Sequence, residues 1–121
     1  SVASRGLGDV YKRQAACIGA DFAKVNYPTE FPGMTRAESL AIASEAAGRT
    51  GIICSGGGTL PPDEFLQRLW EQMNTGNCRG AATGRNIHQK DTENAVKMTA
   101  ACHAIICEGA SVDEALKIYH S

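Results

Sequence analysis

The sequence predicts an α/β fold built on parallel strands, and three observations support this prediction. Short apolar segments with strand-like composition alternate with segments whose apolar residues recur at helical spacing. Glycine-rich loops follow two of the strand segments, at the ends where such folds bind ligands. Hydrophobic residues make up 43% of the 121-residue chain and aromatic residues only 6%, which suits a core of aliphatic and small side chains.

The first strand is expected over residues 20–27, which read ADFAKVNY. Side chains alternate along a strand, so Lys24 shares its face with Phe22 and Asn26, while Ala23 lies on the other face. In a barrel the Lys24 face would point inward, where burial disfavours the ammonium form and leaves an amine that attacks a carbonyl to form an imine. The alternative is a structural lysine that extends to solvent or pairs with the neighbouring aspartate.

Helix-capping and turn-forming residues predict where the next two elements begin and end. Thr35 and Glu38 form a capping box, which opens a helix that is expected to end near Gly48. A short buried strand is expected over residues 50–54, because this apolar run is bounded by turn-forming residues.

The second half of the chain continues the same alternation. Pro61 and the proline after it suit the first turn of a helix that is expected to end at Gly76. Residues 78–83, CRGAAT, are a weak third strand of small residues. Asp91 caps a long helix, and the capping box of residues 111–114 opens the terminal helix.

The long helix is expected to pack through one face that includes a histidine. His103 on this face is interpreted as a partly buried, hydrogen-bonded core residue rather than a ligand. The face consists of Val96, Thr99, Ala100, His103 and Cys107.

Two glycine loops at neighbouring strand ends predict a phosphate site. Ser55, Gly56 and Gly57 follow the second strand, and Gly84 and Arg85 follow the third. Glycine lets backbone N–H groups approach an anion closely, and the guanidinium of Arg85 offers a bidentate charged contact. Either loop alone would be read as an ordinary turn, but barrel enzymes often hold phosphate with the loops after their last two strands.

Composition excludes several classes of protein. The formal net charge is -1, from 12 Lys+Arg and 13 Asp+Glu, which argues against a nucleic-acid partner or a polybasic membrane anchor. The five cysteines contain no CxxC pair and are expected to be mostly buried thiols in a reducing, cytoplasmic compartment. No His, Cys and Asp residues have zinc-ligand spacing, so no metal site is expected.

The first residues are expected to be foreign to the fold. Residues 9–14 read DVYKRQ, which is the translation of a transposon-end adapter used in sequencing. The alternative is a natural polar tail. Residues 1–14 are therefore interpreted as an adapter-derived tail, and residues 15–121 as the native domain.

Residues 15–121 resemble the archaeal and bacterial type of class I fructose-bisphosphate aldolase. The resemblance implies a TIM (β/α)8 barrel, of which this chain would supply the C-terminal part, about strands six to eight. Without the resemblance, three parallel strands fit either an open sheet or a barrel of roughly 250 residues. The matching segments are GADFAKVNYP (19–28), GRTGIICSGGG (48–58), FLQRLWEQM (65–73), ATGRNIHQ (82–89) and EGASVDEALKIY (108–119).

The resemblance also implies roles and a reaction. Lys24 matches the Schiff-base lysine of the family, and the two glycine loops match its phosphate-binding loops. The implied reaction is the reversible cleavage of fructose 1,6-bisphosphate to dihydroxyacetone phosphate and glyceraldehyde 3-phosphate in glycolysis and gluconeogenesis, with no metal cofactor. The family's proton-transferring tyrosine and an acidic residue lie upstream of Lys24, and Glu30 is a candidate local acid or base. The full-length enzyme is expected to be a homo-oligomer and the isolated fragment inactive.

Two other functions stay open at this point. One is a related Schiff-base barrel enzyme that acts on another phosphorylated ketose or on deoxyribose phosphate. The other is a non-catalytic phosphate-binding half-barrel in which Lys24 is only structural.

Overall fold

The computed structural model describes residues 14–121 and confirms the alternation of strands and helices. The expected foreign tail, apart from Gln14, lies outside the described residues. The elements are β1 Phe22–Val25, α2 Arg36–Ala46, β2 Gly51–Ser55, α3 Pro62–Asn74, β3 Gly80–Ala82, α4 Arg85–His88, α5 Thr92–Glu108 and α6 Val112–His120.

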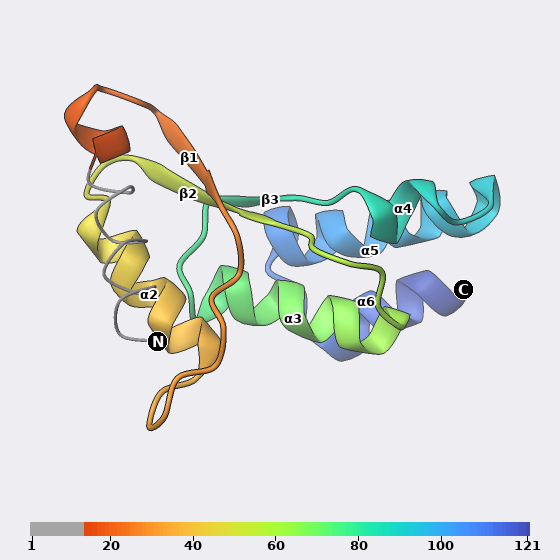
Figure 1. Cartoon of the computed structure of the whole chain (residues 1–121). Helices are drawn as coiled ribbons and strands as arrows, with labels where there is room; N and C mark the ends of the chain where they lie inside the picture. Colours follow the sequence, from red (N-terminus) through yellow and green to blue (C-terminus); the bar gives the residue numbers. More distant parts are fainter. Residues whose placement is uncertain (1–13) are drawn as a thin grey trace.

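The three strands form one parallel sheet in the order β1-β2-β3. Lys24 pairs with Ile53 in the register between β1 and β2, and Ser55 pairs with Ala82 between β2 and β3. The carboxyl ends of β2 and β3 therefore lie side by side. Figure 1 shows α2 and α3 along one side of the strands, with α4 directly beyond the end of β3.

One core cluster lies between α2 and the sheet. Leu40 and Ala47 from the α2 region pack with Ile52 and Cys54 of β2, and each of these is 1% exposed or less. Helix α2 begins where the sequence predicts, because Thr35 and Glu38 make both hydrogen bonds of the capping box. This packing fixes which face of the sheet meets the helices.

A second core cluster joins α3, α5 and α6, and it corrects the predicted face of α5. The prediction for His103 was wrong, because its side chain is 60% exposed and its Nε2 lies 3.5 Å from Glu108 Oε1. Val96 is also 64% exposed. Helix α5 turns another stripe with the same helical spacing toward α3 and α6, so the contacts between helices decide which stripe is buried. The α5 residues in this cluster are Met98, Ala101, Cys102 and Ile105.

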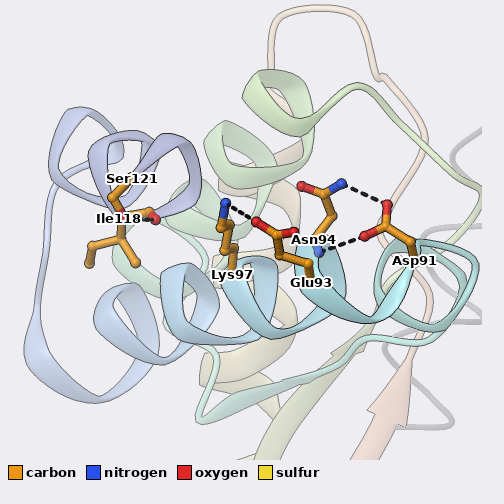
Figure 2. Close-up of polar contacts among 6 residues, drawn as sticks. All are labelled: Asp91, Glu93, Asn94, Lys97, Ile118 and Ser121. Atoms are coloured by element: carbon orange, nitrogen blue, oxygen red, sulfur yellow. Dashed lines mark hydrogen bonds and ion pairs between the residues drawn. The ribbon is translucent and has the colours of Figure 1, made fainter.

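The ends of the C-terminal helices are fixed by local polar contacts (Figure 2). Asp91 accepts hydrogen bonds from Asn94 N at 3.0 Å and from Asn94 Nδ2 at 2.7 Å, which lower the pKa of its carboxyl group. Glu93 and Lys97 form an ion pair of 2.9 Å one turn apart. Ser121 Oγ donates to Ile118 O at 2.7 Å. The predicted cap at Asp91 is thus confirmed.

Three of the five cysteines are buried, as expected from the sequence. Burial raises the pKa of the Cys102 thiol to about 11. Such a thiol stays protonated near neutral pH and makes a poor nucleophile. Cys54 is completely buried on the helix side of β2, away from the face that carries Lys24. The buried set is Cys54, Cys78 and Cys102, whereas Cys17 and Cys107 are exposed.

Candidate active site

Lys24 lies on the face of β1 that the helices leave uncovered. Ala23 and Val25 pack against the core cluster beneath α2, whereas Lys24 and Phe22 are exposed on the opposite face. The predicted alternation of side chains is therefore confirmed. Within residues 14–121, Lys24 makes no ion pair, so the predicted alternative of a pair with Asp21 is not observed.

The Lys24 face continues directly to the first glycine loop. Asn26, two residues beyond Lys24, accepts a hydrogen bond from Ser55 Oγ at 2.8 Å. Ile53 lies beside Lys24 in the register, and Ser55 follows Ile53 by two residues on the same face. The lysine and the first residue of the loop thus share one face of the sheet, with Ser55 nearer its carboxyl edge.

The two predicted loops meet at Gly56. The Gly56 N–H donates to the Ala82 carbonyl at 2.9 Å, one step beyond the ladder of β2 and β3. A Cβ atom on Gly56 would lie 3.3 Å from both Ala82 O and Thr83 Cα, so the close approach favours glycine. Gly57 has a φ of 69°, in the left-handed region that also favours glycine. The loops that the sequence predicted to be neighbours are therefore in direct contact.

Asn86 joins the same two loops, although it was not among the predicted site residues. Its side chain is buried at 1% exposure. The Oδ1 atom accepts from Leu60 N at 2.8 Å, and Nδ2 donates to Gly58 O at 3.0 Å and to Gly56 O at 3.4 Å. A signal was present in the matching segment ATGRNIHQ (82–89), but an asparagine in the first turn of a helix is usually solvated.

The two remaining predicted site residues, Arg85 and Glu30, are both exposed. Arg85 is the first residue of α4, is exposed, and makes no ion pair within the described part of the chain. Its guanidinium is therefore available to an anion. Glu30 is exposed in the loop after β1 and has no hydrogen-bond or ion-pair partner among residues 14–121. The ring of His88 lies 3.5 Å from where a Cβ atom on Gly84 would be.

A phenol and two guanidinium groups lie together on the helix side of the sheet. The ring of Tyr27 lies 4.7 Å from Arg36 Cζ and 5.7 Å from Arg68 Cζ, measured to the ring centroid. The Tyr27 hydroxyl donates to Glu71 Oε2 at 3.4 Å. Burial and the carboxylate of Glu71 raise the pKa of Tyr27 to about 12, so the phenol stays protonated at neutral pH.

Arg68 connects this cluster to the first glycine loop. Its NH1 atom lies 3.9 Å from where a Cβ atom on Gly57 would be. Glu71 is occupied by Tyr27 and by Gln67 Nε2 at 2.9 Å, and Arg68 forms no ion pair within the described part of the chain. The Arg68 guanidinium therefore lies close to Gly57 without an ion-pair partner in this part of the structure.

Residues 14–121 contain neither a metal-binding cluster nor a membrane-spanning helix. No three His, Cys, Asp or Glu side chains in this range lie close enough together to hold a metal ion. No helix in the same range has the length and apolar character that crossing a bilayer requires.

The family profile of DeoC/LacD family aldolases matches residues 11–90 of the chain. Among characterised relatives, the fructose-bisphosphate aldolase/6-deoxy-5-ketofructose 1-phosphate synthase of Methanocaldococcus jannaschii is 53% identical over 107 residues. That alignment covers 88% of this chain and 33% of the relative. A class 1 fructose-bisphosphate aldolase of Halobacterium salinarum is 39% identical over 104 residues, which cover 86% of this chain and 36% of the relative.

Solved structures show the same similarity. A fructose-bisphosphate aldolase from Slackia heliotrinireducens superposes with a TM-score of 0.91 and 45% identity, over 96% of this chain and 36% of that one. An archaeal aldolase whose catalytic lysine is bound to a carbinolamine intermediate superposes with a TM-score of 0.70 at 22% identity, over 84% of this chain and 38% of that one. The latter supports the fold alone.

These comparisons confirm the predicted fold class, since the three parallel strands and their helices match part of TIM-barrel aldolase structures. The chain spans about a third of the length of the curated relatives it matches. The numbering of its strands as six to eight stays a prediction.

Proposed function

The chain belongs to the DeoC/LacD aldolase family, and on this basis we propose that it carries the Schiff-base lysine and the phosphate-binding loops of a class I fructose-bisphosphate aldolase. One observation carries the proposal. Lys24 lies on the uncovered face of the sheet. The two glycine loops follow β2 and β3 at their carboxyl ends, and a hydrogen bond joins them.

In the proposed reaction the Lys24 amine attacks the C2 ketone of fructose 1,6-bisphosphate, and loss of water gives an iminium ion. The C4 hydroxyl loses its proton to a base, the C3–C4 bond breaks, and its electron pair neutralises the iminium to give an enamine. Glyceraldehyde 3-phosphate leaves as the aldehyde. Protonation of the enamine at C3 and hydrolysis of the imine then release dihydroxyacetone phosphate. The iminium is the electron sink, so the mechanism requires no metal ion.

The two loops would hold the phosphate on C1 of the substrate. Within residues 14–121, the backbone N–H groups of Gly57 and Arg85 have no acceptor, and the Arg85 guanidinium has no carboxylate partner. Ser55, Gly56 and Gly84 complete the proposed phosphate site. Anchoring the phosphate keeps the ketone carbon near the Lys24 amine. The two groups then react within one complex, which lowers the entropic barrier to imine formation.

The base and acid of the reaction are only partly represented in this chain. Tyr27 is unsuited to proton transfer, because its hydroxyl donates to Glu71 on the helix side of the sheet and its pKa is about 12. Glu30 is exposed in the loop after β1 and stays our candidate for a local acid or base. We infer that the remaining groups come from strands upstream of Lys24.

The M. jannaschii relative favours a second candidate function. Its name records 6-deoxy-5-ketofructose 1-phosphate synthase alongside the aldolase activity. The same lysine and phosphate loops could therefore serve another phosphorylated ketose. Turnover measured side by side on fructose 1,6-bisphosphate, on other ketose phosphates and on deoxyribose phosphate would rank these substrates.

The test uses a whole barrel, because the chain spans only 33% of this relative. In the M. jannaschii protein, residues 15–121 of this chain replace the matched third, and we call the resulting protein the completed barrel. Incubation with dihydroxyacetone phosphate and borohydride should reduce the imine to a stable adduct on Lys24, which mass spectrometry locates. Lys24→Met should abolish the adduct, whereas Lys117→Met, on the exposed side of α6, should leave it unchanged.

An adduct on a lysine other than Lys24 would refute the assignment of the Schiff base. An active completed barrel without any adduct would refute the imine mechanism. We further propose that the enzyme is cytoplasmic and homo-oligomeric, and that sugar phosphates are its ligands. Size-exclusion chromatography with light scattering on the completed barrel tests the oligomeric state.

A further inference from the structure

We propose that Asn86 is a positioning residue that holds the two glycine loops in the arrangement that a substrate phosphate requires. Through the loops it would control the affinity for phosphorylated substrates and leave the imine chemistry of Lys24 unchanged. This inference rests on the proposed function, because it concerns the same phosphate site.

The contacts of Asn86 cross between the two loops. Its side chain bonds to Gly56, Gly58 and Leu60, which precede it by 26 to 30 residues in the sequence. It lies directly after Arg85, so its position also fixes the backbone from which the Arg85 guanidinium extends. At 1% exposure the side chain has no water to replace a lost partner, and an unmade hydrogen bond there carries the full desolvation penalty.

The chemistry of the site specifies an amide. A backbone N–H at Leu60 needs an acceptor, and two carbonyls at Gly56 and Gly58 need a donor. A primary amide supplies both from one planar group, and three of its four hydrogen-bonding positions are used here. A carboxylate of the same shape would satisfy Leu60 but would repel both carbonyls.

Among residues 14–121, two other hydrogen bonds join the loops, and neither can replace Asn86. The Gly56 N–H to Ala82 carbonyl bond fixes the backbone only where β2 ends. The Thr59 Oγ1 to Gln89 Oε1 contact, at 2.6 Å, is exposed to solvent. Residues 57–60, the part of the loop that leads into α3, are therefore held to the second loop from the inside by Asn86.

The decisive variant is Asn86→Asp in the completed barrel, because it keeps the shape and removes the donors. The KM for fructose 1,6-bisphosphate should rise about tenfold or more, as expected when buried carbonyls lose a donor and face a negative charge, while kcat changes less than about threefold. Borohydride trapping of unphosphorylated dihydroxyacetone on Lys24, at a saturating concentration, should proceed as in the unaltered protein. Asn74→Asp, on the exposed end of α3, is the matched control and should leave KM unchanged.

Asn86→Ala keeps the inference testable should Asn86→Asp fail to fold. It removes the same three bonds without adding charge, and it should raise KM in the same direction by a smaller factor. A normal KM for fructose 1,6-bisphosphate in either folded variant would overturn the inference. Equal loss of dihydroxyacetone trapping and of fructose 1,6-bisphosphate turnover would also overturn it, because it would show a general structural role. If the unaltered completed barrel folds but forms no imine, the proposed function itself fails, and the two failures are thereby distinguished.

Discussion

The two faces of the three-stranded sheet differ sharply in their packing. On the helix side, Leu40, Ile52 and Cys54 are each 1% exposed or less. On the other side, Phe22 is 59% exposed and Lys24 lies beside it. Side chains along β1 and β2 therefore alternate between a face packed against the helices and an open face that carries Lys24.

This difference shows how the fold separates stability from chemistry. Substitutions on the packed face should change the free energy of unfolding and leave the site intact. Substitutions at the carboxyl edge of the other face should change binding. The open face in this chain would be the interior of a complete barrel, since related aldolases are about three times as long as the matched region.

The largest expected effect tests this interpretation of the two faces. In the completed barrel, Leu40→Ala should lower the free energy of unfolding by about 3 kcal/mol, because it leaves a cavity in a tightly packed cluster. Phe22→Ala should cost a similar amount, about 3 kcal/mol, if its face becomes the barrel interior. Urea unfolding of both variants gives the comparison.

Leu40→Ala serves as the reference for Phe22→Ala, because its cluster is already complete in this chain. A cost below about 0.5 kcal/mol for Phe22→Ala, the range of ordinary surface substitutions, would show that the face stays exposed. The sheet would then be open rather than part of a closed barrel.

A smaller effect is expected where the two loops touch. Gly56→Ala places a methyl group 3.3 Å from Ala82 O and Thr83 Cα, which are backbone atoms that cannot move aside freely. The KM for fructose 1,6-bisphosphate should rise about tenfold, equivalent to about 1.4 kcal/mol. Gly58→Ala is the matched control, because a Cβ atom there meets nothing within 4 Å. Steady-state kinetics that show the same KM for both variants would contradict the prediction.

The smallest effect concerns the helix-side cluster around Tyr27. Its pKa is raised from 10.0 to about 12 in the folded protein, so the phenol contributes stability that is fully present below pH 10. This contribution should be lost as the pH rises toward about 12. An alkaline titration followed by absorbance at 295 nm should show a late tyrosine ionisation that Tyr27→Phe removes. Ionisation of Tyr27 near pH 10 would contradict the role of burial and Glu71.

Local signals in the sequence were sufficient to predict the framework of the site. The alternation of side chains along the first strand predicted the face of the sheet on which Lys24 lies. The predicted capping boxes at Thr35 and Ser111 are both present in the structure. The glycine loops were predicted to be neighbours because they follow adjacent strands, and they are in contact. Each of these features depends on residues close together in the sequence or on the order of the strands.

Features that depend on distant partners were not predictable in the same way. Asn86 bonds to residues 26 to 30 positions away, and Tyr27 bonds to Glu71, 44 positions away. The buried face of α5 was also predicted wrongly, because α3 and α6 contact a different stripe of the helix, which contains Met98, Ala101, Cys102 and Ile105. Sequence periodicity indicates a helical stripe, but neighbouring helices decide which stripe they bury.

The hydrogen bonds that Asn86 makes between the two loops have a consequence for protein engineering. Loops of barrel enzymes are often treated as independent modules that can be exchanged one at a time. Here the buried amide of Asn86, in the short helix that follows the second loop, bonds to backbone groups of the first loop, so a graft of either loop alone would leave polar groups without partners. The two loops should therefore be transplanted, recombined or randomised together as one inseparable cassette.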